Sequence, residues 1–328
     1  MASIAYANTI DYNFPLRQRP HHIMDILAAR GHSIHWVDNT QVEGLRPDRY
    51  ENLTVWHNWD VFKKRVPEVD VYFSSWSHRY IDLNQVKSKI VLYDSLDNFE
   101  ANELEEVNMI NKADILLTTS APLYTLRKQQ HNNVHLCRNA CFSENDNINI
   151  EIPEDVKQFK NGYMLFSGAM ANWVDIELIE KVAKLYDVVV VGKLFGVSKM
   201  PKGVHYLGNK SYNDLQKYYK FCSLNLLPFK RCQVADFSNP LKMYESLVYG
   251  RVTIATDIPE ATIYPNAVLP SKNHEEFINN IKYALKRKDD INIINKCKQV
   301  AKENDWDNRV DIIEKAIYDF AESKGIVL

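Results

Sequence analysis

Short apolar runs alternate with amphipathic stretches along almost the whole chain. The runs are rich in β-branched and aromatic residues, which is typical of strands buried between helices in a parallel sheet. The stretches between them repeat apolar residues at helical spacing, as Leu178, Ile179 and Val182 do within residues 175–186. The pattern predicts an α/β protein. Its predicted strands are residues 3–9, 33–38, 69–76, 89–96, 113–120, 133–139, 162–169, 187–193, 203–209, 223–229 and 252–257. Its predicted helices are residues 21–31, 103–112, 122–130, 175–186, 211–222, 237–250, 275–288, 291–304 and 308–323.

One polar segment interrupts this alternation. Residues 143–160 are polar and acidic and contain Pro153, and strands and helices alternate again after them. A chain of 328 residues suits two domains of about 100–200 residues each. We therefore interpret residues 143–160 as an interdomain linker and expect two doubly wound domains, one over residues 1–150 and one from residue 151 onward. Ligands of such sheets bind beyond the carboxyl ends of the strands, so we expect the site in the cleft between the domains.

The charge and the cysteine content exclude several classes of protein. A net charge of −2 argues against a dedicated nucleic-acid binder. The sequence has no apolar run of about 18 residues and no leader pattern, so we expect a cytoplasmic location. Five irregularly spaced cysteines and ten histidines without an HExxH pattern predict no structural metal.

Two glycine-containing turns follow strands of the second half. Ser167, Gly168 and Ala169 end one strand before a helix, where small residues let backbone N–H groups approach a phosphate closely. Lys193 follows a glycine at the end of the next strand, where it could lie over a diphosphate. The alternatives are a simple tight turn for the first feature and a surface lysine for the second.

The segment FSNPLKMYESLVYG, residues 237–250, predicts a helix that Asn239 caps and Pro240 begins. Lys242 then lies in the first turn, where a cation opposes the helix dipole unless an anion lies there too. Glu245 lies three residues further on, on the same face, and a carboxylate can accept hydrogen bonds from a ribose. A salt bridge between Lys242 and Glu245 on a solvated face is the alternative.

Two groups of charged residues lie in the first half. Asp94 and Asp97 end a predicted central strand, so either could be a general base or a ligand of sugar hydroxyls, although Asp97 could instead cap the next helix. Arg17, Arg19 and His21 open the first helix, where they could hold an anionic acceptor or simply face solvent.

Several blocks, in this order, resemble bacterial GT-B glycosyltransferases, most of all small enzymes of cell-surface polysaccharide and teichuronic-acid assembly. The blocks include QRPHHIMDILAARGHSIHWV, IVLYDSLDNF, LFSGAMANWVDIELI and NPLKMYESLVYGRVTIATDIPE, within residues 15–262. The resemblance implies two Rossmann-like domains that face each other across a cleft. Residues 1–150 would bind the acceptor, residues 151–305 would bind a nucleotide-sugar donor, and a last helix in residues 306–328 would cross back to the first domain.

The same resemblance assigns residues. Gly168 would contact the donor phosphates, Asn239, Leu241 and Lys242 would hold the diphosphate and sugar, and Glu245 would hold the ribose. It implies no cofactor and no metal, because protein charge stabilises the departing diphosphate. Many retaining members carry a glutamate where this chain has Phe237, so retention or inversion stays open. If the enzyme inverts, Asp97 or Asp94 is the expected base.

The expected activity is transfer of a sugar from a nucleotide diphosphate to a glycan, and the expected nucleotide is UDP. The expected acceptor is lipid-linked at the cytoplasmic membrane face, which implies peripheral membrane contact. Two alternatives remain: a sugar-nucleotide 2-epimerase of the same architecture, and a non-catalytic partner of another glycosyltransferase.

Overall fold

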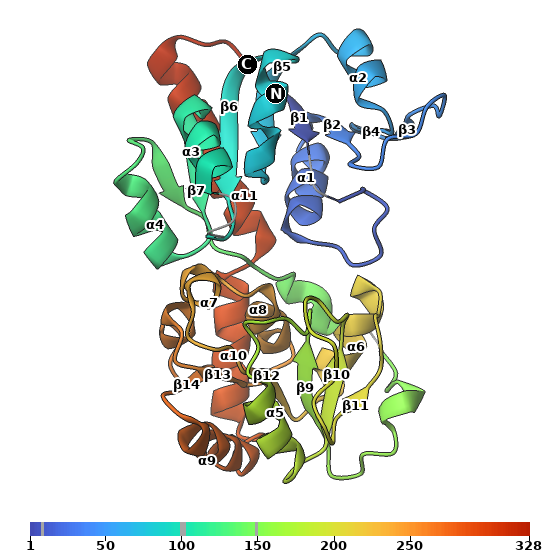
Figure 1. Cartoon of the computed structure of the whole chain (residues 1–328), viewed down its shortest axis with the longest axis vertical. Coiled ribbons are helices and arrows are strands. Elements are labelled where there is room, and N and C mark those ends of the chain that lie inside the picture. Colours follow the sequence, from blue (N-terminus) through green and yellow to red (C-terminus); the bar gives the residue numbers. More distant parts are fainter. Residues whose placement is uncertain (8–9, 99–102, 148–149) are drawn as a thin grey trace. The chain divides into compact units, whose positions relative to one another are not determined.

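The computed structural model describes residues 1–7, 10–98, 103–147 and 150–328, and divides into two units (Figure 1). Unit 1 is Met1–Arg138 with Trp306–Leu328, and unit 2 is Asn139–Asp305. The first boundary thus lies before Asn139, earlier than the expected break after residue 150. The difference arises because residues 139–143 already bond to unit 2, where the Cys141 N–H donates to the Asn304 carbonyl.

Unit 1 is built on a sheet of eight strands in the order β3-β4-β2-β1-β5-β6-β7-β8. All neighbouring strands are parallel except β3 and β4. The strands are β1 Ser3–Ala7, β2 Ser33–Val37, β3 Asp48–Tyr50, β4 Leu53–Trp56, β5 Glu68–Ser74, β6 Lys87–Ser95, β7 Ile115–Thr118 and β8 Val134–Leu136. The helices are α1 Arg19–Ala29, α2 Trp59–Arg65, α3 Glu103–Lys112, α4 Ala121–Lys128 and α11 Trp306–Lys324, with the 3-10 helix η1 Ser77–Asn84.

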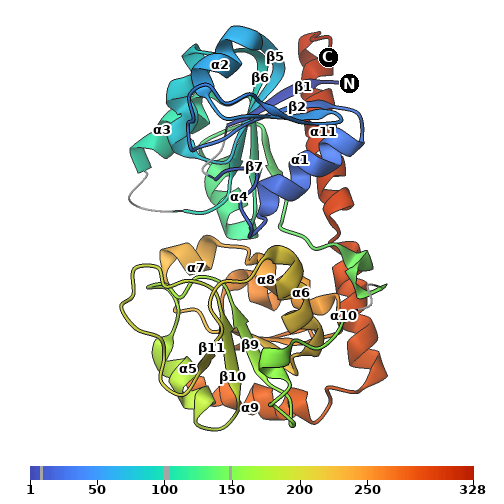
Figure 2. The same ribbon diagram turned by 90° about the vertical axis from the view of Figure 1, so that its right-hand side faces the viewer.

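The last helix, α11, belongs to unit 1. It runs beside α1, as both views show (Figure 2). The Arg30 guanidinium at the end of α1 donates to Asp307 and Asp311 of α11 at 2.9 and 2.7 Å. The chain therefore returns to its first unit after completing the second.

Unit 2 is built on a parallel sheet of six strands in the order β11-β10-β9-β12-β13-β14. The strands are β9 Met164–Ser167, β10 Val188–Val191, β11 His205–Tyr206, β12 Leu224–Leu227, β13 Thr253–Thr256 and β14 Val268–Ser271. The helices are α5 Ile176–Ala183, α6 Tyr212–Phe221, α7 Gln233–Phe237, α8 Leu241–Leu247, α9 His274–Leu285 and α10 Ile291–Glu303, with the 3-10 helices η3 Ser143–Asn147, η4 Glu154–Val156 and η5 Pro259–Thr262.

Both sheets reverse direction in the manner of a doubly wound fold. In chain order the strands of unit 2 lie as 3-2-1-4-5-6, so the first strand, β9, has β10 on one side and β12 on the other. Ligands of such sheets bind at the carboxyl ends next to that reversal. Gly168 directly follows β9, and α8 comes between β12 and β13 along the chain. The predicted donor residues Gly168, Lys242 and Glu245 therefore follow the carboxyl ends of β9 and β12.

The predicted α/β class and most predicted elements are confirmed, and Ser211 caps α6 through its side chain. The last two residues of the first predicted strand, residues 8–9, lie outside the described residues. The pattern missed β3, β4 and α2, because residues 48–65 mix apolar and charged residues too closely for either period to stand out. It also missed β14, an edge strand that contains Pro270.

Candidate functional site

The helix α8 begins one residue later than the sequence predicts. Pro240 occupies the cap position, with φ −67° and ψ 118°, and no side chain caps this end. Asn239 is instead buried, and its amide nitrogen donates to the Tyr244 hydroxyl and to the Glu260 carboxylate at 2.9 and 2.7 Å. Both amide hydrogens of Asn239 are thus used inside unit 2, which leaves none for a diphosphate. Leu241, the first residue of α8, is partly exposed.

Lys242 lies in the first turn of α8 with its ammonium group against two aromatic rings. Its Nζ lies 4.8 Å from the ring centre of Phe166 and 5.2 Å from that of Phe229. Within the described residues, no side chain or carbonyl accepts a hydrogen bond from this ammonium. Its surroundings lower its pKa to about 8 through desolvation, which the Glu245 carboxylate partly offsets. A cation held in this way is stabilised by an anionic ligand.

Gly168 gives Lys242 its space. The φ of Gly168 is +121°, and a Cβ built there would collide with Lys242 Nζ and lie 3.1 Å from its Cε. The Gly168 N–H donates to the Val191 carbonyl at 2.8 Å. The expected contact between this N–H and a phosphate is therefore not available, and what the glycine provides is room for the lysine.

Glu245 lies on the same helix as part of a buried polar cluster, which we define as Ser167, Tyr219, Lys242 and Glu245. The Glu245 side chain is 4% exposed, and this burial raises its pKa to about 7 against the opposing effects of the Tyr219 hydroxyl and the Lys242 charge. The Tyr219 hydroxyl also lies 2.5 Å from Ser167 Oγ. Glu245 lies close enough to Lys242 to affect its pKa, so the two residues belong to the same candidate site. The contact between Glu245 and a ribose stays a prediction.

Lys193 lies on the exposed loop after β10. Its Nζ lies 5.8 Å from the ring centre of Phe195, and that ring lies 6.0 Å from the ring of Trp173. The Lys193 carbonyl accepts a hydrogen bond from the Met170 N–H at 2.8 Å, which joins this loop to the loop after Gly168. The two loops are therefore neighbours, but the structure does not bring the Lys193 ammonium into the cluster of Lys242 and Glu245.

The two aspartates of unit 1 have different surroundings. Asp94 is fully buried and accepts hydrogen bonds from Arg19 Nε and Nη2 at 2.8 and 3.0 Å. This bidentate pair occupies both carboxylate oxygens, so Asp94 is poorly placed to take a proton from a substrate. Asp97 is partly exposed, and desolvation followed by the negative charge of Glu106 raises its pKa to about 6. A carboxylate whose pKa lies near neutral pH suits a general base.

The basic residues at the start of α1 do not form the predicted acceptor site. Arg19 is 4% exposed because it pairs with Asp94, and Arg17 bonds to Asp25. His21 is buried and stacks on Trp36 with 4.7 Å between ring centres. The pairing of Arg19 with Asp94 was not visible in the sequence, because 75 residues separate them.

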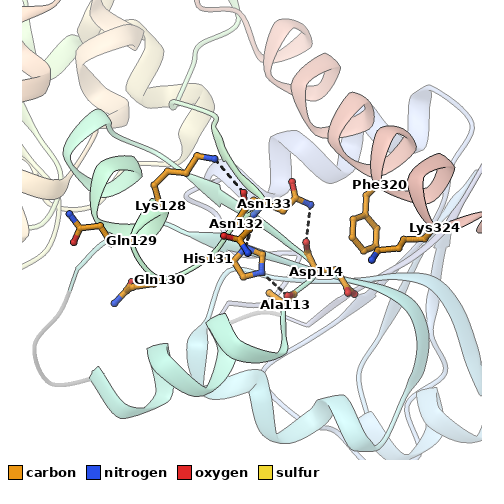
Figure 3. Close-up of a pocket in the computed structure, with 10 residues that line it drawn as sticks. All are labelled: Ala113, Asp114, Lys128, Gln129, Gln130, His131, Asn132, Asn133, Phe320 and Lys324. Carbon is orange, nitrogen blue, oxygen red and sulfur yellow. Dashed lines mark hydrogen bonds between the residues drawn. The ribbon is translucent and has the colours of Figure 1, made fainter.

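A polar pocket of about 420 Å³ lies elsewhere in unit 1 (Figure 3). It opens where β7 and β8 begin, at the edge opposite to the one where ligands of parallel sheets bind. Several of its polar groups bind one another: Lys128 donates to the Asn132 carbonyl and Asn133 donates to the Asp114 carbonyl, as the dashed lines show. We therefore do not assign the function to this pocket.

The described part of the chain also bears on metal binding and membrane spanning. Within it, no three His, Cys, Asp or Glu side chains lie together in a way that could bind a metal ion. None of its helices combines the length and the apolar character needed to cross a membrane.

The chain is similar to known proteins in its structure but not in its sequence. No protein-family model and no curated protein sequence matches the chain. Sucrose-phosphate synthase from Thermosynechococcus elongatus superposes with a TM-score of 0.74 at 11% identity, covering 98% of this chain and 100% of that one. HepE of Anabaena, in complex with UDP, gives 0.69 at 12% identity, covering 97% and 100%. WaaG, a glycosyltransferase of lipopolysaccharide biosynthesis, gives 0.63 at 12% identity, covering 96% and 98%. The chain has the GT-B fold, as the resemblance predicts.

Proposed function

We propose that this chain is a glycosyltransferase whose unit 2 binds a nucleotide diphosphate sugar, with the diphosphate at Lys242. The observation that carries the proposal is the Lys242 ammonium, which lies beside Gly168 without a hydrogen-bond acceptor among the described residues. A diphosphate would supply the missing negative charge and accept charge-assisted hydrogen bonds. The fold supports the proposal, because similar structures include HepE with UDP and with UDP-glucose.

In the proposed reaction the bond between the anomeric carbon and the diphosphate oxygen breaks, and the acceptor oxygen forms a bond to that carbon. Lys242 stabilises the negative charge that develops on the departing diphosphate. If the configuration inverts, Asp97 of unit 1 takes the proton from the acceptor hydroxyl. If it is retained, the departing diphosphate oxygen takes that proton and Asp97 binds a sugar hydroxyl. NMR of the newly formed glycosidic bond distinguishes these roles, since a retained configuration removes Asp97 as the base.

The finer assignments rest on the resemblance. We propose UDP as the nucleotide and a lipid-linked glycan as the acceptor, on the cytoplasmic face of a membrane. The likeness to WaaG, which takes part in lipopolysaccharide biosynthesis, supports a role in cell-surface polysaccharide assembly.

Calorimetric titration with UDP-, GDP- and dTDP-sugars and the free nucleotides tests the proposal. We expect binding of UDP and of at least one UDP-sugar, and no response to any of them would exclude a donor site. Product analysis with and without a lipid-linked acceptor then separates transfer from epimerisation, because an epimerase converts the donor without an acceptor.

The affinity for UDP is expected to fall as the pH rises through about 8. The surroundings lower the pKa of Lys242 to about 8, so the lysine is charged below this pH and loses its charge above it. If the protonated form is needed, the affinity falls about tenfold between pH 7 and pH 9. Titration of UDP across this range measures the effect. Lys242→Arg is the control. Arginine stays charged across this range, so the affinity of this variant for UDP should not fall between pH 7 and pH 9. Glu245 is unchanged in the variant, so any remaining pH dependence would come from groups other than Lys242.

Chelation of metal ions is expected to leave the transfer rate unchanged, because we propose that Lys242 supplies the positive charge at the diphosphate. The measurement compares initial rates with and without EDTA after dialysis of the protein. A loss of activity that Mg²⁺ or Mn²⁺ restores would contradict this part of the proposal.

A further inference from the structure

The chain passes between the two units twice, between Arg138 and Asn139 and between Asp305 and Trp306. On the unit 2 side, the two crossing segments are bonded to each other. The Cys141 N–H donates to the Asn304 carbonyl at 3.1 Å, and Cys141 forms a parallel bridge with Asp305. The Ser143 N–H donates to the Asp305 carboxylate at 2.8 Å. The two crossings therefore form one joined structure.

A line of hydrogen bonds connects the first crossing to α8. The Asn139 N–H donates to Asn239 Oδ1 at 2.8 Å, and Asn239 Nδ2 donates to the Tyr244 hydroxyl at 2.9 Å. Asn239 and Tyr244 are 3% and 0% exposed, so water does not compete for these bonds. Tyr244 lies on α8 between Lys242 and Glu245 in sequence.

The same line continues to the second crossing. The Tyr244 and Tyr264 hydroxyls lie 3.4 Å apart, and the Tyr264 hydroxyl donates to Asn304 Oδ1 at 2.8 Å. Because Tyr264 gives its hydrogen to Asn304, the Tyr244 hydroxyl must be the donor between the two tyrosines. Every hydrogen in the line then points from Asn239 toward Asn304. We call these five residues, Asn139, Asn239, Tyr244, Tyr264 and Asn304, the crossing network.

Packing of its buried residues Met243, Tyr244 and Leu247 holds α8 within unit 2, and the crossing network adds hydrogen bonds at the start of the helix. Pro240 provides no side-chain cap, and α8 is 7 residues long. Asn225 Nδ2 donates to the Lys242 carbonyl at 3.2 Å, which anchors the same turn to β12. Beside this packing, the bonds from Asn225 and the crossing network help to set the position of the turn that carries Lys242.

We propose that the crossing network positions α8 for the donor and couples donor binding to the two chain crossings. This inference rests on the proposed donor site. A diphosphate bound at Lys242 restrains α8, and Tyr244, on the same helix, passes the restraint to both crossing segments. The coupling is reciprocal, so loosening the crossing network weakens donor binding even though Tyr244, Tyr264 and Asn304 act through α8 and not on the ligand.

Hydrogen exchange followed by mass spectrometry, on the full chain with and without saturating UDP, tests the coupling. In the wild-type chain we expect UDP to slow exchange in peptides that cover α8 and in those that cover Cys141 and Asn304–Trp306. In Tyr244→Phe, which keeps the ring and removes the hydroxyl, we expect slowing at α8 and none at the crossings. We expect its Kd for UDP to rise about fivefold, the scale for the loss of one hydrogen bond.

Two further variants make the result specific. Tyr264→Phe removes the next hydroxyl of the crossing network and should abolish the slowing at Asn304–Trp306, while the link from Tyr244 through Asn239 to Asn139 remains. Tyr218→Phe removes a hydroxyl that bonds to Asp155 in unit 2, outside the crossing network, and should behave like the wild type.

The outcomes separate this inference from the proposed function. If UDP binds the wild-type chain but leaves exchange at both crossings unchanged, the coupling is wrong and the donor site stands. If Tyr244→Phe and Tyr264→Phe both retain the slowing at the crossings, the crossing network is not its route. If calorimetry shows no binding of any nucleotide, the proposed function and this inference both fail.

Discussion

Replacing Arg19 by methionine is expected to lower the free energy of unfolding of unit 1 by about 3–5 kcal/mol, the cost of leaving one charge of a buried pair without its partner. Arg19 and Asp94 are 4% and 0% exposed, and two hydrogen bonds join them. Arg19 Nη1 also donates to the Arg138 carbonyl at 3.0 Å, so the substitution removes a bond at the end of unit 1 as well. Methionine fills much of the same volume and cannot neutralise Asp94.

Urea unfolding followed by tryptophan fluorescence measures this effect. Of the 6 tryptophans, Trp173 lies in unit 2 and the others lie in unit 1, so the signal reports mainly on unit 1. Arg17→Met is the matched control, because Arg17 pairs with Asp25 near the surface and should cost less than about 1 kcal/mol. Adding Asp94→Asn to Arg19→Met should recover part of the loss. A loss no larger than that of the control would show that the buried pair does not stabilise unit 1.

Replacing Lys242 by alanine is expected to weaken UDP binding about 10- to 100-fold, which corresponds to about 1.5–3 kcal/mol for a hydrogen bond to a charged group. The stability of the free protein should change little, since the ammonium lies against Gly168 and the rings of Phe166 and Phe229 without a hydrogen-bond acceptor among the described residues. Calorimetric titration with UDP measures the affinity, and a thermal melt without nucleotide measures the stability.

Two other lysines serve as comparisons for this variant. Lys217 pairs with Asp214 on α6, and its replacement by alanine should leave the affinity unchanged. Lys193→Ala tests the predicted second phosphate ligand, for which the structure shows no contact with the Lys242 cluster. An affinity that falls in Lys193→Ala and not in Lys242→Ala would move the diphosphate to the loop after β10.

The periodic pattern was enough to predict the α/β class and most elements, because burial between helix layers forces apolar residues into runs that local sequence reveals. It was not enough for residues whose surroundings come from distant parts of the chain. The sequence makes Asp94 a candidate base, but in the structure Arg19 donates to both of its carboxylate oxygens. Gly168 was expected to offer an N–H to a phosphate, but Val191 on the neighbouring strand takes that hydrogen.

The segment around α8 shows the same limit. Asn239 has the residue type of a helix cap, and its position before a proline favoured that interpretation. Its side chain instead joins Asn139 to Tyr244, and neither partner is marked by any local pattern. The sequence singles out Lys242 by its unfavourable place in a first helical turn, because that signal depends on sequence position alone, and its role as a diphosphate ligand stays a prediction.

The most direct test of the donor site is a crystal structure of the chain with UDP bound. The account predicts that a diphosphate oxygen lies about 2.7–3.0 Å from Lys242 Nζ. A complex in which UDP is well ordered but its diphosphate lies beyond the reach of Lys242 would contradict the account.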